Sequence, residues 1–427
     1  MKNRLKYLVI FFLGLGMTAC NTPVGPDNTK DPDEVPADVA VRMHKSPKRG
    51  IAFNLNRTDD AQLLTPYISW DYNWGVTCAE GVYSLFMVDN GIDFCPMAWN
   101  DINDATLDAW CAAHPETRYL LAYNEPNLTD QANMTPQQAA AKWPKLKSAA
   151  VRNNLKIIAP AMNYGTLAGY SDPEKWYDEF FQLIPIDDVA GLSVHCYMAS
   201  PSALQGYIRK FEKYNKPIWL TEFCAWDPVP SSVDAQIRYM CNALNWLEMY
   251  RSVERYAWFI PRAGMPVTSA PYMQLLTPAQ PSELTDLGKI YCQLSSFDRS
   301  VWLDTRMPVR ACEYVDVLDS TVQVLPSGEE FGFLKVDMAK PKWTEYQVWF
   351  PSGVKALELR YSSPVNTQFV IYIDGEYAGN WDAPKTTQTT DENWVTLPVE
   401  ADFPQGKHSM RIEILKGGFD LVWFWAK

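Results

Sequence analysis

Apolar residues occur in eight short runs that alternate with helix-like patterns between Arg49 and about Phe297. Several of these runs are apolar at consecutive positions, as is typical of parallel strands whose two faces are both buried. The pattern therefore predicts eight strands connected by helices. We expect the strands at residues 50–53, 67–72, 93–97, 119–123, 156–159, 191–197, 218–222 and 256–260.

Helix-start signals stand between these runs. Residues 135–138 (Thr-Pro-Gln-Gln) form a capping box with proline at the first helical position. Residues 172–173 (Asp-Pro) open a second helix, and Ser232 is the expected cap of a third. Eight strand–helix units in roughly 250 residues match a (β/α)8 TIM barrel, which we expect over residues 49–298. An open doubly wound sheet is the alternative, but it normally carries a glycine-rich phosphate turn that this sequence lacks.

After about Phe297 the helical patterns stop and turn signals recur at short intervals. Regularly spaced short strands indicate a sandwich or barrel. We expect an all-β sandwich of jelly-roll type over residues 305–427. Within it, Asp374-Gly375 between apolar segments predicts a β-hairpin.

The first residues resemble an export signal. Basic residues at positions 2, 4 and 6 precede an apolar run over residues 8–15, too short to span a membrane permanently. Small residues before Cys20 resemble a bacterial lipobox, so we expect residues 1–20 to be a signal peptide and Cys20 to be lipidated; an ordinary signal cleaved nearby is the alternative. Residues 21–48 have few large apolar side chains and are expected to form a flexible linker. The expected location is the outer membrane, on the cell surface or the periplasmic face.

The formal net charge of −12 argues against a nucleic-acid partner, and membrane contact is expected only through the lipid. Four scattered histidines and no Cys-x-x-Cys pair argue against a structural zinc site, and no cofactor is implied. For the eight cysteines besides Cys20, the sequence leaves two alternatives, disulfides or buried free thiols. A monomer is expected.

Two of the expected strands end in glutamate: the fourth runs into Asn124-Glu125, and the seventh ends at Glu222. Catalytic residues of (β/α)8 barrels lie at the C-terminal ends of strands, and a carboxylate there costs desolvation energy unless the site uses it. Strands four and seven stand across the barrel mouth. Two facing carboxylates are what a retaining glycosidase needs, one as acid/base and one as nucleophile.

The segment Asn124-Glu125-Pro126-Asn127 resembles the strand-four signature of clan A glycoside hydrolases. The longer pattern is similar to glycoside hydrolase family 128, which acts on β-1,3-glucans. It also includes the segments at residues 48–53, 70–74, 94–99, 133–143 and 220–223. The resemblance covers about residues 48–298 and implies that Glu125 is the acid/base and Glu222 the nucleophile.

Other strand ends supply candidates for contact with a β-glucan oligo- or polysaccharide. Asn124 is placed to bond the sugar 2-hydroxyl, Tyr197 to orient Glu222, and aromatic rings to stack on sugars. Core packing is the alternative for each aromatic residue and for His195. The candidate substrate-binding residues are Asn124, Tyr72, Asn73, Trp74, Trp99, Tyr164, His195, Tyr197, Trp226 and Trp258.

The C-terminal segments at residues 343–348, 357–362, 372–375, 406–412 and 418–421 resemble carbohydrate-binding modules of family 6 or 35. The resemblance implies a sugar site at Tyr361, Trp394 and Asp420. A calcium ion in the sandwich is also possible from the resemblance, without a clear ligand set. A sandwich that only braces the barrel is the alternative.

The expected function is that of a retaining glycoside hydrolase acting on β-1,3-glucan, with internal cleavage expected. A β-1,4- or β-1,6-glucan substrate is the first alternative. A non-catalytic surface glycan-binding lipoprotein is the second, because fold alone does not decide activity.

Overall fold

Parallel strands form where the apolar runs predict them. The computed structural model describes residues 34–263, 272–329, 331–339, 342–387 and 392–427. Six strands make a parallel sheet in the order β4-β3-β2-β9-β8-β7, and β5 pairs with β6. These strands are β2 (Arg49–Ala52), β3 (Trp70–Tyr72), β4 (Asp93–Phe94), β5 (Tyr119–Leu121), β6 (Lys156–Ile158), β7 (Leu192–Met198), β8 (Ile218–Asp227) and β9 (Val253–Trp258).

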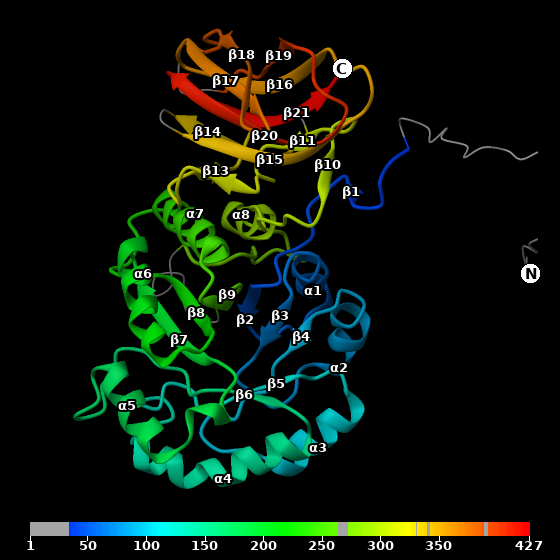
Figure 1. Ribbon diagram of the computed structural model, residues 1–427. Coiled ribbons are helices and arrows are strands. Elements are labelled where there is room, and N and C mark those ends of the chain that lie inside the picture. The colour runs from blue at the N-terminus through cyan, green and yellow to red at the C-terminus, as the bar shows by residue number, and fades with distance from the viewer. Residues whose placement is uncertain (1–33, 264–271, 330, 340–341, 388–391) are drawn as a thin grey trace, which may run out of the picture. The chain divides into compact units, whose positions relative to one another are not determined.

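Helices connect these strands, and Figure 1 shows α3 to α7 around their outside. The predicted helix starts are confirmed: Thr135 and Gln138 make the reciprocal capping box, Asp172 caps α5, and Ser232 caps α7. The helices are α1 (Thr58–Leu64), α2 (Glu80–Val82), α3 (Asp104–Ala113), α4 (Pro136–Arg152), α5 (Pro173–Leu183), α6 (Pro201–Lys210), α7 (Val233–Met249) and α8 (Asp286–Gln293). This part of the chain is therefore a mixed α/β fold. No described helix is long and apolar enough to cross a membrane.

The C-terminal region is all-β, as predicted. One sheet has the order β1-β10-β15-β20-β17-β18 with β12 on β15, and the other β13-β14-β21-β16-β19 with β11 on β21. Ring contacts between Tyr346 and Phe424 and between Phe369 and Phe419 join the two sheets. The strands are β1 (Val39–Ala40), β10 (Trp302–Asp304), β11 (Val309–Arg310), β12 (Asp316–Val317), β13 (Gln323–Leu325), β14 (Lys335–Ala339), β15 (Trp343–Phe350), β16 (Ala356–Ser362), β17 (Thr367–Ile373), β18 (Glu376–Ala383), β19 (Val395–Glu400), β20 (Gly406–Lys416) and β21 (Gly418–Ala426).

The predicted hairpin at Asp374-Gly375 joins β17 to β18, with Ile373 opposite Glu376. Both turn residues have positive φ, 51° and 83°, as a tight primed turn requires. All eight cysteines of the described residues are free thiols, so packing without disulfides holds both regions.

The two regions share contacts, and residues 36–427 form one compact unit. The buried Asn245 of α7 donates to the carbonyl of Val322 at 3.0 Å and accepts from the hydroxyl of Tyr314 at 2.8 Å. The thiol of Cys241, one turn earlier on α7, contacts the carbonyl of Val324 at 3.2 Å. Asn245 and Cys241 of α7 therefore bond to Tyr314 and to the backbone at Val322 and Val324 of the β region.

Part of the expected linker is structured. Residues 39–40 form β1, which pairs in parallel with β10. The ammonium group of Lys48 donates to the carbonyls of Leu247, Glu248 and Tyr250 at the end of α7, at 2.8–3.0 Å. Composition does not reveal this packing because strand pairing and helix capping need few apolar side chains. The predicted signal peptide over residues 1–20, with Cys20, and residues 21–33 of the predicted linker lie outside the described residues.

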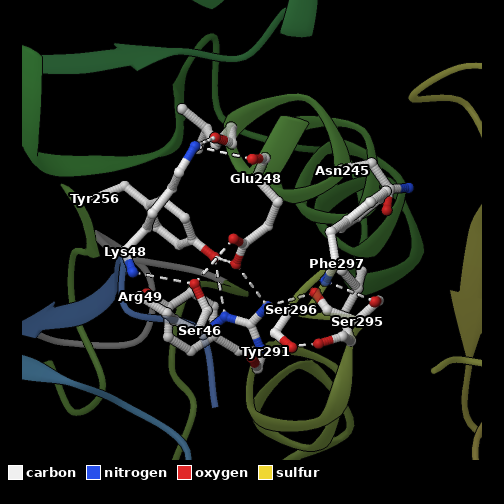
Figure 2. A network of polar contacts seen from close by, with 12 residues as sticks. Ser46, Lys48, Arg49, Asn245, Glu248, Tyr256, Tyr291, Ser295, Ser296 and Phe297 are labelled. Atoms are coloured by element: carbon white, nitrogen blue, oxygen red, sulfur yellow. Dashed lines mark hydrogen bonds and ion pairs between the residues drawn. The ribbon is translucent and has the colours of Figure 1, made fainter. Parts of the chain in front are cut away.

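A buried polar network connects β2 to α7 and α8 (Figure 2). Arg49 donates to the hydroxyl of Tyr256 at 2.9 Å, to the carboxylate of Glu248 at 3.0 Å, and to the carbonyls of Tyr291 and Ser295 at 2.8 and 2.9 Å. Arg49 is only 2% exposed. A buried charge is tolerated only when it is paired and hydrogen-bonded, so the network depends on all its members.

Replacing Arg49 with leucine should leave Glu248 buried without its guanidinium partner. We expect the free energy of unfolding to fall by about 3–5 kcal/mol, measured by urea unfolding followed by tryptophan fluorescence. The double variant Arg49→Leu/Glu248→Leu should recover part of the loss, because neither charge then remains unpaired. The exposed Arg251 is the matched control, and its leucine variant should change stability by less than about 0.5 kcal/mol. Equal midpoints for Arg49→Leu and Arg251→Leu would contradict this role.

Candidate active site

The two glutamates predicted from the strand ends meet in one cavity. This cavity has a volume of about 570 Å³, within the usual range for ligand sites. Its lining residues are Trp74, Trp99, Asn124, Glu125, Leu128, Gln131, Asn163, Tyr197, Glu222, Trp226 and Phe259. Polar groups at the centre and aromatic rings around them suit a ligand with hydroxyl groups and apolar faces.

Backbone geometry presents Glu125 to the cavity. The chain leaves β5 through Asn124, which bridges in parallel to Ala161, and then turns at Glu125 with a φ of 43°. A left-handed backbone is rare for a residue with a side chain and concentrates at functional sites. Glu222 lies within β8 instead, so the strand itself fixes its position.

Glu222 is held by three neutral donors. The hydroxyl of Tyr72 and the indole N–H of Trp74 donate to Oε1 at 2.7 and 2.8 Å, and the hydroxyl of Tyr197 donates to Oε2. Glu222 is 4% exposed. Several hydrogen bonds to one carboxylate fix its orientation.

Glu125 has a different set of partners. Asn163 donates to its Oε1 at 3.1 Å, and Nδ1 of His195 contacts the same oxygen at 2.9 Å. The same nitrogen lies 3.4 Å from Oε2 of Glu222. His195 is completely buried and therefore links the two carboxylates.

Glu125, His195 and Glu222 form one tight cluster. One ligand atom from each lies within 4.8 Å of the other two, and no other described group of three His, Cys, Asp or Glu has such spacing. The donor set is chemically able to bind a divalent metal ion. The 2.9 Å contact between Glu125 and His195 is the length of a charge-assisted hydrogen bond, so the cluster is also arranged to share protons.

The matched segments of known proteins coincide with this part of the chain. Residues 50–291, more than half of the chain, match the family described as "Glycosyl hydrolase catalytic core". A solved GH128 (subgroup II) endo-β-1,3-glucanase from Pseudomonas viridiflava is 35% identical, with a TM-score of 0.53, over 58% of this chain and 98% of that one. This chain belongs to glycoside hydrolase family 128. It is therefore a glycoside hydrolase.

Two other relatives match a similar share of the chain. The GH128 (subgroup II) endo-β-1,3-glucanase from Sorangium cellulosum is 31% identical with a TM-score of 0.52, over 57% of this chain and 97% of that one. Alkali-sensitive linkage protein 1 of Schizosaccharomyces pombe is 27% identical over 260 residues, 58% of this chain and 44% of the relative. The chain thus spans less than half the length of that curated relative.

The pKa values of this family 128 site follow from the cluster. Burial acts to lower the pKa of His195, but the charge of Glu222 and the hydrogen bond and charge of Glu125 raise it above its ordinary value. Burial acts to raise the pKa of Glu125, but the hydrogen bond and charge of His195, with the Asn163 bond, lower it on balance. A pKa of Glu125 raised by burial and by the neighbouring nucleophile is the simple expectation for a general acid, and the imidazolium reverses it here.

The cavity receives most, but not all, of the predicted sugar contacts. Tyr72 and His195 are completely buried and touch the glutamates. The Asn73 amide bonds Thr77 in its own loop and Asn54 in the loop between β2 and α1. Tyr164 packs against Tyr207 instead of lining the cavity. Five other candidates line the cavity: Trp74, Trp99, Asn124, Tyr197 and Trp226.

The prediction that Trp258 stacks on a sugar is corrected. Its ring is completely buried, and its N–H donates to the carbonyl of Met273 at 2.8 Å. The next residue, Phe259, lines the cavity and stacks on Trp226 with ring centroids 6.0 Å apart. Successive side chains of a strand point to opposite faces, so a one-residue error moves a prediction from the cavity into the core.

The prediction for Tyr164 is also off by one residue, because the neighbouring Asn163 is the residue that lines the cavity. Asn163 contacts Glu125 and lines the cavity, although only its neighbour is predicted. Leu128 and Gln131 were also missed, and they follow Glu125 in a loop where no strand register guides a prediction. Asn163 carries a signal that was available, since it is the first polar residue after the apolar residues 157–162, which include the end of the predicted strand.

The predicted sugar site of the C-terminal region is only partly accessible. Tyr361 is 2% exposed, and its hydroxyl donates to the carbonyl of Pro384 at 2.9 Å, so its ring belongs to the core and the prediction is corrected. Asp420 accepts from Lys335 at 2.7 Å. Lys335 also pairs with Glu392, whose carboxylate accepts from the Trp394 indole at 3.1 Å. Trp394 and Asp420 therefore stand at one ion-pair network.

We expect His195 to titrate above its ordinary pKa of about 6.5, because two carboxylates flank Nδ1. In the variant Glu125→Gln the pKa of His195 should fall, since one charge and one charged hydrogen-bond acceptor are lost while Glu222 remains. NMR titration of histidine-labelled protein measures both values, and only four histidines need assignment. A His195 pKa that is unchanged by Glu125→Gln, or that lies at or below 6.5 in the unmodified protein, would contradict the shared proton.

Proposed function

We propose that the protein is a retaining endo-β-1,3-glucanase in which Glu125 is the general acid/base and Glu222 the nucleophile. The observation that carries this proposal is the close approach of the two carboxyl groups, since one oxygen of Glu125 and one of Glu222 lie within 4.8 Å of each other. Retaining glycosidases hold their carboxyl groups about 5–5.5 Å apart, whereas inverting ones leave about 6.5–9.5 Å for a water molecule. The relatives from Pseudomonas viridiflava and Sorangium cellulosum are endo-β-1,3-glucanases, which supports the linkage and internal cleavage.

In the first step Glu222 attacks the anomeric carbon while the leaving oxygen takes a proton from Glu125. His195 lowers the pKa of Glu125 and the two carboxylates raise that of His195, so we propose that the imidazole holds the proton in the free protein. This proton reaches Glu125 along the 2.9 Å contact between Nδ1 and Oε1. His195 is thus the proton reservoir of the acid.

In the second step a water molecule attacks the anomeric carbon, and Glu125 takes its proton as general base. A lowered pKa suits this role, since Glu125 must be ionised once the leaving group has departed. The proton then returns to His195. One residue therefore serves as acid and base because its partner stores the proton between the steps.

The remaining cavity residues orient the substrate. Asn124 is 4% exposed, its amide contacts Gln131 at 3.2 Å, and its Oδ1 has no partner among the described residues. An unpaired buried polar atom is costly, and a sugar 2-hydroxyl would satisfy it. The stacked Trp226 and Phe259 supply an apolar wall for the pyranose ring.

We also propose that β2 to β9 close into a (β/α)8 barrel. The parallel bridges Met97–Leu121 and Ile158–Gly191 link the ends of the six-stranded sheet to the β5–β6 pair. Sites in such barrels lie at the C-terminal ends of the strands, which agrees with the positions of Glu125 and Glu222.

We propose that the C-terminal β-sandwich either binds glycan or braces the barrel. We also propose that residues 1–20 direct export and that lipidated Cys20 anchors the protein at the outer membrane.

Reducing-sugar release from laminarin tests the proposal, with β-1,4- and β-1,6-glucans in parallel and the chain from residue 21 onward as enzyme. The variants Glu125→Gln and Glu222→Gln should lose activity by at least about 100-fold, since general acid–base catalysis contributes 10²–10⁴-fold. Glu400→Gln, a change at an exposed glutamate of β19, should keep wild-type activity. Proton NMR of fresh products should show the β-anomer first.

Each alternative gives a different result in this experiment. Release only from β-1,4- or β-1,6-glucan would overturn the linkage, and an α-anomer as first product would overturn retention. Binding to glucans without any release would favour a non-catalytic glycan-binding protein.

A further inference from the structure

The two oxygens of Glu222 have different partners. Oε1 accepts from the hydroxyl of Tyr72 at 2.7 Å and from the indole N–H of Trp74 at 2.8 Å. Oε2 accepts from the hydroxyl of Tyr197 and lies 3.4 Å from Nδ1 of His195. The indole N–H is the single hydrogen-bond donor of a tryptophan side chain. Its placement on a buried carboxylate therefore indicates a function.

The loop holds Trp74 in an unfavourable backbone conformation. Its φ is 62°, in the left-handed region that bulky residues rarely adopt. Asn73 secures the turn on both sides: its Oδ1 accepts from the N–H of Gly75 at 3.1 Å, and its amide donates to the carbonyl of Thr77 at 2.9 Å. A strained residue persists only where its surroundings determine it, and such residues cluster at functional sites.

Packing fixes the indole ring as well. Its ring meets Tyr72 edge-on with centroids 5.5 Å apart, and Phe259 edge-on at 6.0 Å. Tyr72 is completely buried. Both donors to Oε1 are therefore held in place before any ligand arrives, as electrostatic stabilisation of a transition state requires.

Geometry also distinguishes the oxygen that attacks. Nδ1 of His195 lies between Oε1 of Glu125 at 2.9 Å and Oε2 of Glu222 at 3.4 Å. Oε2 is thus the nucleophile oxygen that faces the acid, and the scissile bond must lie between the two carboxyl groups. Attack by Oε2 leaves Oε1 as the carbonyl oxygen of the glycosyl ester.

We propose that Trp74 and Tyr72 act on Oε1 in the second half of the reaction, where they stabilise the Glu222 carboxylate as it leaves the sugar. The inference rests on the proposed function. In that step the water oxygen bonds to the anomeric carbon, the bond from this carbon to Oε2 breaks with its electron pair on Glu222, and the water proton passes to Glu125. Negative charge then spreads onto Oε1, which accepts the hydrogen bonds of Tyr72 and Trp74.

The first step has the opposite charge balance. There the carboxylate loses charge as it bonds the sugar, so the two donors stabilise the starting state more than the transition state. Only interactions that strengthen toward a transition state accelerate that step. The donors should therefore raise kcat where the second step limits it, with little effect on kcat/KM.

Steady-state and rapid-mixing kinetics with dinitrophenyl β-laminaritrioside test this inference. Its good leaving group makes hydrolysis of the glycosyl-enzyme limit kcat. In Trp74→Phe and in Tyr72→Phe, kcat should fall about 10²-fold, the effect of removing one preorganised donor, while kcat/KM should change less than about threefold. The burst of one dinitrophenolate per enzyme expected of the wild type should persist in both variants, and their glycosyl adduct should last longer in the intact mass than that of the wild type.

Tyr72→Phe removes only a hydroxyl, so it tests the inference even if the Trp74 variant folds poorly. Trp99→Phe is the matched control, because Trp99 lines the same cavity and has no described bond to Glu222. It should lower kcat/KM and show the same burst and the same rate of glycosyl-enzyme hydrolysis as the wild type. Equal losses of kcat and kcat/KM in both donor variants, with no adduct, would overturn this inference while wild-type laminarin hydrolysis stands. A wild type that hydrolyses no glucan would overturn the proposed function and this inference with it.

Discussion

Two carboxylates that are each more than 90% buried lie within 4.8 Å of each other in this protein. If both were ionised, their repulsion would be on the order of 3 kcal/mol at an effective dielectric constant of 20, and burial would add a desolvation cost. His195 between them offsets this cost with a proton, and the donors around Glu222 offset it with hydrogen bonds. Glu125 and His195 therefore form one protonation unit and exchange a proton instead of titrating independently.

The scaffold has to keep these groups in place against their repulsion. Glu222 and His195 lie on the adjacent strands β8 and β7, where His195 pairs with Glu222 in the parallel register. Glu125 comes from a separate strand end with a left-handed backbone. Away from the glutamates, the buried Arg49 network joins β2 to α7 and α8 (Figure 2). Strain at the cavity and a satisfied ionic network elsewhere agree with the tendency of proteins to sacrifice stability at functional sites.

Both glutamates and most of the secondary structure could be predicted from the sequence, because apolar periodicity, capping residues and polar strand ends are local signals. The errors came where a prediction needs exact register. Trp258 and Tyr164 are each one residue from the side chain that lines the cavity, since strand boundaries alone do not say which of two neighbours faces inward. Tyr361 failed for a related reason, because an aromatic residue at a sheet end serves a core as readily as a binding surface. The direction of the Glu125 pKa was also beyond the sequence, because it depends on a histidine 70 residues away.

Trapping the covalent intermediate is the most direct test of the account. In a 2-deoxy-2-fluoro laminaribioside the fluorine slows both steps, and a dinitrophenolate leaving group keeps the first step faster than the second. A glycosyl-enzyme should therefore accumulate. Peptide mapping by mass spectrometry should then locate the fluorosugar on Glu222, with none on Glu125. An adduct on a different residue, or an active enzyme that never forms one and releases the α-anomer, would contradict the central claim that Glu222 is the nucleophile of a retaining mechanism.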